Sequence, residues 1–178
     1  MRKLALTLAL GLAAYPAAQV AAQSVKSTVT ASNGVQVTVY SDEFANRYEY
    51  SAPSVDLTDG FVLVASIKKG GVATPVYLTG TLIYSGEWRR YNSALFRGGD
   101  PAKFIEAGRE VGRCQASRYS RASCTLSEGF KIQITPAEIS KYAQNGVLAI
   151  QIRAQDTSTV MLQIPVSYFD AVAEVSKR

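Results

Sequence analysis

The sequence contains no histidine, and it has only two cysteines and one tryptophan in 178 residues. Without an imidazole, the Ser-His-Asp and Cys-His nucleophile systems, the HExxH metalloprotease site and histidine pH switches are all excluded. Metal sites lose their commonest ligand, and no DxDxDG-like loop supplies oxygen ligands instead. The GxGxxG and P-loop signatures of nucleotide binding are also missing. We therefore expect no metal, no cofactor and no catalytic residue.

The excess of positive charge is small. The chain has 19 Lys and Arg against 14 Asp and Glu, a formal net charge of +5. Such a mild excess does not indicate a nucleic-acid partner, and we expect none. A hydrophobic fraction of 47% with 19% charged residues is typical of a chain that folds, and the length fits one domain.

The first residues have the organisation of a secretory signal peptide. Arg2 and Lys3 precede the apolar run Leu4–Ala14, which is too short to span a bilayer, since a span needs roughly 20 residues. Pro16 follows, and small residues precede Gln23 as signal peptidase requires. We predict a signal peptide over residues 1–22, a single β-rich domain over 23–178, and a periplasmic or secreted protein with no transmembrane segment after cleavage. The alternative is a core helix of a cytosolic fold.

Export decides the expected state of the cysteines. Cys114 and Cys124 are the only possible pair, and an oxidising compartment favours a disulfide between them. A loop of this size would stabilise the fold by roughly 3 kcal/mol. The alternative is a redox-active thiol pair, although the CxxC spacing is missing.

Alternation of apolar and polar residues dominates the chain. Val35, Val37 and Val39 alternate with polar residues behind the turn dipeptide Asn33-Gly34, which predicts a hairpin over residues 25–40. Further strands are predicted at 48–50, 61–67, 76–84, 88–96, 130–134, 147–152 and 160–164. The expected fold is mainly β: a single-domain antiparallel β-sandwich or small barrel with one or two short C-terminal helices.

Two short helices interrupt this alternation. Thr135 is followed by Pro136 and by Glu138, the pattern of a capping box with proline at the first helical position. A helix is therefore predicted over 135–145, ended by Asn145-Gly146. A final short helix is predicted from Ser167 onward.

A weak resemblance covers roughly residues 80–172. The segments that carry it are Tyr84–Ala94, Arg109–Cys114 and Cys124–Glu128, with Ile164-Pro165 leading into the final helix. Together they resemble small secreted proteins and lipoproteins of bacteria. The resemblance implies a compact, disulfide-bearing β-rich domain and brings no activity with it. This chain departs from the lipoproteins because no cysteine stands at the cleavage position.

Two patterns could carry enzymatic chemistry. Ser66 and Lys69 match the S-x-x-K of serine acyl-enzymes, but three positions apart on a strand they face opposite sides, and the companion motifs are missing. A pair of carboxylates could act as the acid and base of a glycosidase. The candidates are Asp42, Glu43, Glu87, Glu106, Glu110 and Glu128. Their spacing selects no pair.

Arginine and aromatic residues alternate in the middle of the chain. Arginine beside an aromatic ring can hold a phosphate or carboxylate while the ring stacks on a sugar or base. The predicted anion- or partner-binding residues are Arg89, Arg113, Arg118, Arg121, Trp88 and Tyr91. The alternative is a half-buried strand with rings inward and cations outward.

The sequence thus favours an exported, non-enzymatic binding domain. Its expected partner is an envelope protein or an anionic envelope component. A carboxylate-dependent enzyme that degrades cell wall or polysaccharide and a carrier of a lipophilic ligand are the alternative hypotheses. An enzyme requires two carboxylates converging in a cleft, whereas a carrier requires an apolar void.

The signal-peptide prediction is tested by the mass of the exported protein. We expect the chain recovered from the periplasm or medium to begin close to Gln23, because the cut follows the small residues Val20-Ala21-Ala22. Intact-mass spectrometry measures the N-terminus directly. Protein that stays in the cytoplasm and retains Met1 would contradict the prediction.

Overall fold

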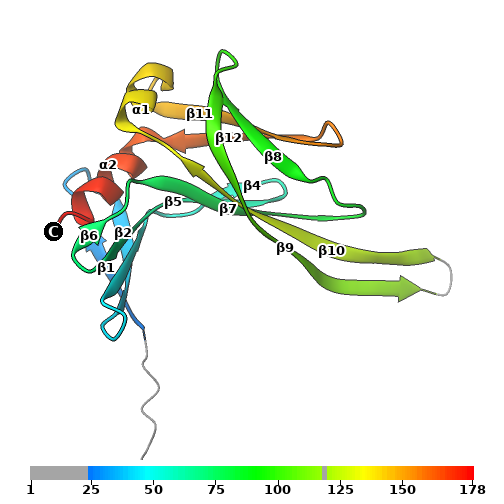
Figure 1. Ribbon diagram of the computed structural model, residues 1–178, viewed down its shortest axis with the longest axis horizontal. Coiled ribbons are helices and arrows are strands. Elements are labelled where there is room, and N and C mark those ends of the chain that lie inside the picture. The colour runs from blue at the N-terminus through cyan, green and yellow to red at the C-terminus, as the bar shows by residue number, and fades with distance from the viewer. Residues whose placement is uncertain (1–23, 118–119) are drawn as a thin grey trace, which may run out of the picture.

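The computed structural model describes residues 24–117 and 120–178, with the side chains of 115–123 left aside. The predicted signal peptide, and Arg118 of the predicted binding residues, lie outside the described residues. Twelve strands form one antiparallel sheet, in the order β1-β2-β3-β5-β7-β10-β9-β8-β11-β12, while β4 and β6 pair with β5 (Figure 1). The elements are β1 Val25–Thr30, β2 Gln36–Asp42, β3 Arg47–Ser51, β4 Val55–Leu57, β5 Gly60–Lys69, β6 Val72–Ala73, β7 Tyr77–Ser85, β8 Tyr91–Phe96, β9 Pro101–Ser117, β10 Ser120–Gln133, α1 Pro136–Tyr142, β11 Val147–Ala154, β12 Thr159–Pro165 and α2 Val166–Val175.

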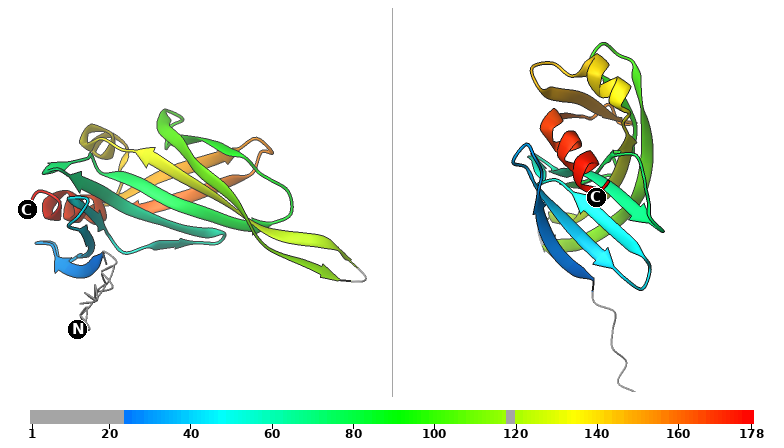
Figure 2. Two further views of the ribbon diagram at one scale, coloured as in Figure 1. Left: turned by 60° about the horizontal axis from the view of Figure 1, so that its bottom comes forward. Right: turned by 90° about the vertical axis from the view of Figure 1, so that its left-hand side faces the viewer.

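The predicted mainly β class with two short helices is confirmed. The sheet coils strongly, so that β8, β11 and β12 lie over β5 and β7, but it does not close into a barrel (Figures 1 and 2). The predicted hairpin at 25–40 is present, with Val29 opposite Val37, and the predicted strands 147–152 and 160–164 form another, with Ile152 opposite Val160. The predicted strand at 88–96 begins only at Tyr91, because residues 86–90 form a loop.

The core fills the inside of the coiled sheet. Alternate residues of the strands point inward, as the alternation predicts, and Leu78, Leu82, Ile150, Ile152 and Leu162 are completely buried. Gly80 belongs to the same surface, since a Cβ there would lie 2.4 Å from the carbonyl oxygen of Phe61 and 2.7 Å from the ring of Phe130. The inner wall therefore allows no side chain at this position.

Helix α2 covers one end of the core. Its residues Phe169, Ala171, Val172 and Val175 are buried, while the helix packs against β2, β3, β5 and β12 (Figure 2). The β1–β2 turn docks onto it, because the hydroxyl of Ser32 donates to the Glu174 carboxylate at 2.6 Å. The N- and C-terminal parts of the domain are thus packed together.

Helix α1 begins with the predicted capping box. The amide of Glu138 donates to the Thr135 hydroxyl at 3.2 Å, and the amide of Thr135 donates back to the Glu138 carboxylate at 2.6 Å. The ring of Tyr142 stacks on Phe96 with centroids 4.3 Å apart, which holds the helix on β8. The helix prediction at 135–145 is therefore confirmed, with the helix ending at Tyr142.

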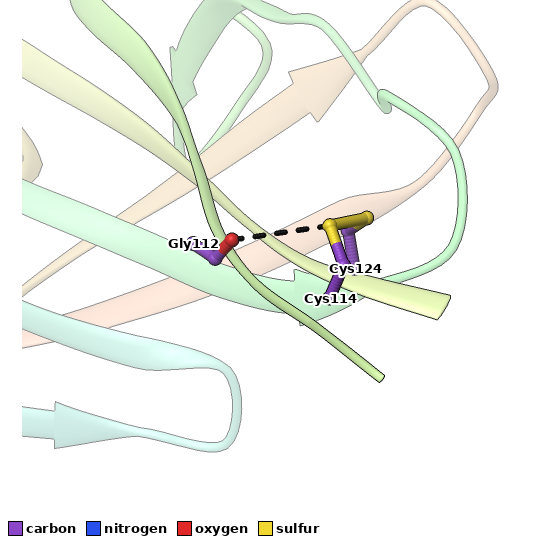
Figure 3. Close-up of a disulfide and its surroundings, with 3 residues drawn as sticks. All are labelled: Gly112, Cys114 and Cys124. Carbon is purple, nitrogen blue, oxygen red and sulfur yellow. Dashed lines mark hydrogen bonds between the residues drawn. A yellow bond between two sulfur atoms is a disulfide. The ribbon is translucent and has the colours of Figure 1, made fainter. Parts of the chain in front are cut away.

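The predicted disulfide between Cys114 and Cys124 is also confirmed. The two residues face each other across β9 and β10, with Cα atoms 3.9 Å apart (Figure 3). A sulfur of the pair lies 4.0 Å from the carbonyl oxygen of Gly112. Because a bonded sulfur has no proton to donate, this is a packing contact. A disulfide is compatible with the expected export. Among the described residues, none of the helices has the length and apolarity that crossing a membrane requires.

Candidate functional site

Three of the predicted binding residues lie in or next to the loop 86–90, which connects β7 to β8. They are Trp88, Arg89 and Tyr91. Gly86 and Arg90 in this loop have positive φ angles of 114° and 58°. The left-handed region is unfavourable for a residue with a side chain such as Arg90, so other contacts must hold the loop in this shape. The main contact comes from β10, through a carboxylate beneath the loop.

Glu128 on β10 is that carboxylate, and it is only 3% exposed. It accepts hydrogen bonds from the amide of Arg90 at 2.8 Å, the amide of Tyr91 at 3.1 Å and the Arg109 guanidinium at 3.0 Å. The hydroxyl of Tyr84 donates to it as well. Both carboxylate oxygens are therefore satisfied by donors from β7, β9 and the loop.

These contacts set the ionisation of the group. Burial acts to raise the pKa of the Glu128 carboxyl, but the hydrogen bonds from Tyr84, Arg109 and the two amides outweigh it, so its pKa lies below the ordinary value. Burial and the bond to Glu128 raise the pKa of Tyr84 to about 12, which keeps the phenol protonated as a donor. Glu128 is thus an ionised acceptor, unsuited to act as a general acid.

Arg89 is held on the other side of the loop. Its guanidinium donates to the Asp59 carboxylate at 3.0 Å and to the Tyr91 hydroxyl at 3.1 Å, and it lies 4.3 Å from the centre of the Tyr84 ring. The bonds to Tyr91 and Asp59 raise the pKa of this guanidinium. Arg89 therefore joins the loop to the β4–β5 turn through its Nη1.

A hollow of about 660 Å³ opens above this network. Its lining includes Trp88 and Arg90 from the loop, together with Val111 on β9 and Leu126 on β10. Cys124 also lines it, so the disulfide lies beside the Trp88 loop. Trp88 is half-buried and Arg90 is exposed. Tyr91 is 2% exposed and supports the loop from below without reaching the hollow.

Beyond the hollow, β9 and β10 continue as a two-stranded arm. In the part of the chain that the structure describes, residues 114–124 of this arm pair only with each other, because β7 joins β10 at Thr125 and β8 joins β9 only at Pro101 and Ala102. Figures 1 and 2 show the arm extending away from the body. Arg113 is exposed on it, and the backbone of Arg121 belongs to it.

The residues of the two possible enzymatic patterns can now be placed in the fold. The hydroxyl of Ser66 is buried and donates to the carbonyl of Thr74 at 2.9 Å, while Lys69 is exposed at the end of β5. Of the six candidate carboxylates, Glu106 and Glu128 meet at the same arginine, with Glu106 2.7 Å from Arg109. Among the described residues, no three Cys, Asp or Glu side chains gather closely enough to hold a metal ion.

Two residues of the network, Glu128 and Asp59, were not predicted to interact, and only the first has a signal in the sequence. Glu128 stands in the series Leu126, Glu128, Phe130 and Ile132, whose other members are apolar and point inward. A carboxylate at an inward position of a strand is the signal that sequence reasoning missed. Asp59 carries no such signal, since a turn aspartate is ordinary.

Comparison with protein-family models, with curated proteins and with solved structures found no match for this chain. Its function is therefore inferred from its own residues.

Replacing Glu128 should lower stability in a pH-dependent way. Glu128→Gln removes a charge that four donors surround, and we expect a loss of about 3 kcal/mol in the free energy of unfolding at pH 7. Because the folded pKa is below the ordinary 4.5, Glu128 contributes this stability above pH 4.5 and loses it as the pH falls toward the folded value.

Urea unfolding of both proteins between pH 3 and 7 measures the effect. The difference between them should narrow below about pH 4.5, whereas the exposed neighbour variant Glu110→Gln should stay close to the parent at every pH. A difference that is constant with pH would show that Glu128 does not act through its charge.

Proposed function

We propose that the protein is an exported, non-enzymatic binding domain that recognises an anionic component of the bacterial envelope. The binding elements are the β9–β10 arm and the hollow at its base. An acidic partner protein is the other expected ligand, and the test below separates the two. The disulfide is compatible with export, and the only buried carboxylate among the described residues is held by four donors.

The arm is the observation that carries this proposal. Between Glu110 and Glu128 the sequence contains Arg113, Arg118 and Arg121 and no acidic residue, so this stretch has a charge of +3. Residues 111–114 are exposed, and residues 114–124 pair with no third strand among the described residues. A cationic hairpin in this position can meet an anionic surface with either face.

The hollow adds a second contact to the arm. Arg90 and Trp88 line it together with the acidic Glu87 and Asp156. A guanidinium near an indole can bind a phosphate or carboxylate while the ring stacks on a sugar. The amides of Arg90 and Tyr91 donate to the Glu128 carboxylate, and these bonds fix the loop before any ligand arrives. Binding therefore requires little reordering of the loop.

Removing the charges of the arm should weaken binding to anionic membranes. We expect the variant Arg113→Ala/Arg118→Ala/Arg121→Ala to bind phosphatidylglycerol vesicles about 100-fold more weakly, because each cation near such a surface contributes about 1 kcal/mol. Binding of the parent should also fall steeply with salt, since charges are screened beyond about 10 Å at 0.1 M. Co-sedimentation with vesicles measures both effects.

The matched control replaces three cations elsewhere. Lys26, Lys69 and Lys177 are exposed on other elements, and their triple alanine variant should retain nearly full binding. Equal losses in both variants would show a nonspecific charge effect and contradict the proposal. A different result would assign the arm to a protein partner: the parent does not bind vesicles but binds an acidic envelope protein, and the triple arginine variant loses that binding.

A second candidate function is the binding of an apolar small molecule. The groove between α1 and α2 has a volume of about 970 Å³, which suits a drug-sized or lipid-like ligand. Its lining is mostly apolar and includes Val76, Ile134, Ile139 and Phe169. This groove lies beside the helices and not inside the sheet, where the carrier hypothesis placed its cavity.

Filling the groove tests the second candidate. Ala173 lines it from α2, and Ala173→Trp should weaken binding of the neutral fluorophore N-phenyl-1-naphthylamine at least tenfold, because the indole takes the ligand's space. Ala45→Trp, in the exposed β2–β3 turn, is the control. Fluorescence titration measures both. Equal affinities for the two variants would exclude the groove as the site.

A further inference from the structure

The two ends of the coiled part of the sheet face each other across a groove. Strand β12 is the last strand of the sheet, and among the described residues it pairs only with β11. Strand β4 pairs only with β5. Residues of both strands line one groove of about 560 Å³.

The edge of β12 has unpaired backbone groups directed into this groove. The amide of Ala154 donates to the carbonyl of Ser158 at 2.9 Å. This bond shows which residues of β12 direct their backbone groups toward β11. In an antiparallel pair the bonding direction alternates, so Val160 and Leu162 point their backbone groups toward β11. Thr159, Met161 and Gln163 then point theirs away from β11, and these three residues line the groove.

Along Thr159–Gln163 this edge carries none of the features that usually protect an edge strand, and a proline, Pro165, stands only at its end. Exposed edges are commonly blocked by charged side chains, prolines or bulges. The residues whose backbone groups face away from β11 are Thr159, Met161 and Gln163. Their side chains are uncharged, and that of Met161 is 51% exposed. The opposite edge of the sheet, β1, carries Lys26 on its outward side. The stretch Thr159–Gln163 of the β12 edge is therefore open to pairing.

The walls of the groove define what can occupy it. Val55, Leu57 and Val160 are half-buried on its walls, so apolar side chains entering there would complete their burial. Asp56 and Asp59 also line it, while no Lys or Arg does. Asp59 is already paired with Arg89, which leaves the exposed Asp56 as the attachment point for a cation.

The sheet also sets the direction of an occupant. Neighbouring strands from β4 through β5, β7, β10, β9, β8 and β11 to β12 are all antiparallel, so β4 and β12 run in opposite directions. A strand between them is antiparallel to one and parallel to the other. Since β12 has seven residues and β4 only three, β12 offers the longer antiparallel ladder.

We propose that this groove binds an extended segment of a partner polypeptide as an added strand, antiparallel to β12. Its backbone pairs with Thr159, Met161 and Gln163. Its inward side chains are apolar, and it places a lysine or arginine beside Asp56. The surface is lined by other residues than the arm and the hollow, and this inference holds whether or not the arm binds anions.

The probe is a short fluorescein-labelled peptide in which valine and threonine alternate around a central lysine. We expect it to bind the protein in fluorescence anisotropy, and hydrogen–deuterium exchange should slow at the amides of Met161 and Gln163. A peptide with glutamate at the centre should bind at least tenfold more weakly, because it meets Asp56. No binding of the lysine peptide at millimolar concentration would overturn the proposal.

Two variants locate the contact. Met161→Pro removes an outward amide that β11 does not use, and it should abolish binding; Thr28→Pro, at an outward position of β1, is the matched control and should leave binding unchanged. Asp56→Lys, which leaves β12 unaltered, should lower the affinity for the lysine peptide at least tenfold. It keeps the proposal testable if either proline variant fails to fold.

Several outcomes count against the proposal. Unchanged peptide binding in Met161→Pro, or in Asp56→Lys, would place the peptide elsewhere. Slowed exchange on β1 instead of β12 would do the same. Slowed exchange on β12 that rises with protein concentration in the absence of peptide would show that a second copy of the chain occupies the edge, and not a partner segment.

Discussion

The buried carboxylate of Glu128 is the interaction on which the centre of the structure depends. It joins β10 to Tyr84 on β7, to Arg109 on β9 and to the amides that begin β8. A charge in this position is stable only while its partners surround it, because an uncompensated buried charge costs several kcal/mol. The left-handed Arg90 and the shape of the loop 86–90 follow from this contact, and with them the wall of the hollow.

The strong coiling of the sheet explains both the core and the open surfaces. Coiling brings β12 over β4 and encloses one apolar core without closing the ring of strands. Helix α2 covers one end of that core, whereas nothing in the described residues fills the space between β4 and β12. An incompletely closed sheet leaves backbone donors and acceptors at its edges, and such edges are natural places for a partner strand.

The arm is the part of the fold that packing accounts for least. A two-stranded hairpin with no third layer is only marginally stable in water, and clustered arginines add repulsion. The disulfide between Cys114 and Cys124 holds the two strands together where packing does not. Our proposal assigns the charges of the arm to contacts with another molecule.

The sequence by itself determined the elements with local signals. Alternating valines, Asn33-Gly34 and the capping box at Thr135 each act through neighbouring residues, so their strands, turn and helix could be predicted. Cys114 and Cys124 could be paired because no other cysteine exists. The outer part of the long strands β9 and β10 could not, since residues 111–114 are all exposed and so need no apolar alternation. Only the tertiary structure decided the role of Arg89, because its partner Asp59 lies 30 positions away in a turn, and a pairing at that distance depends on how the sheet coils.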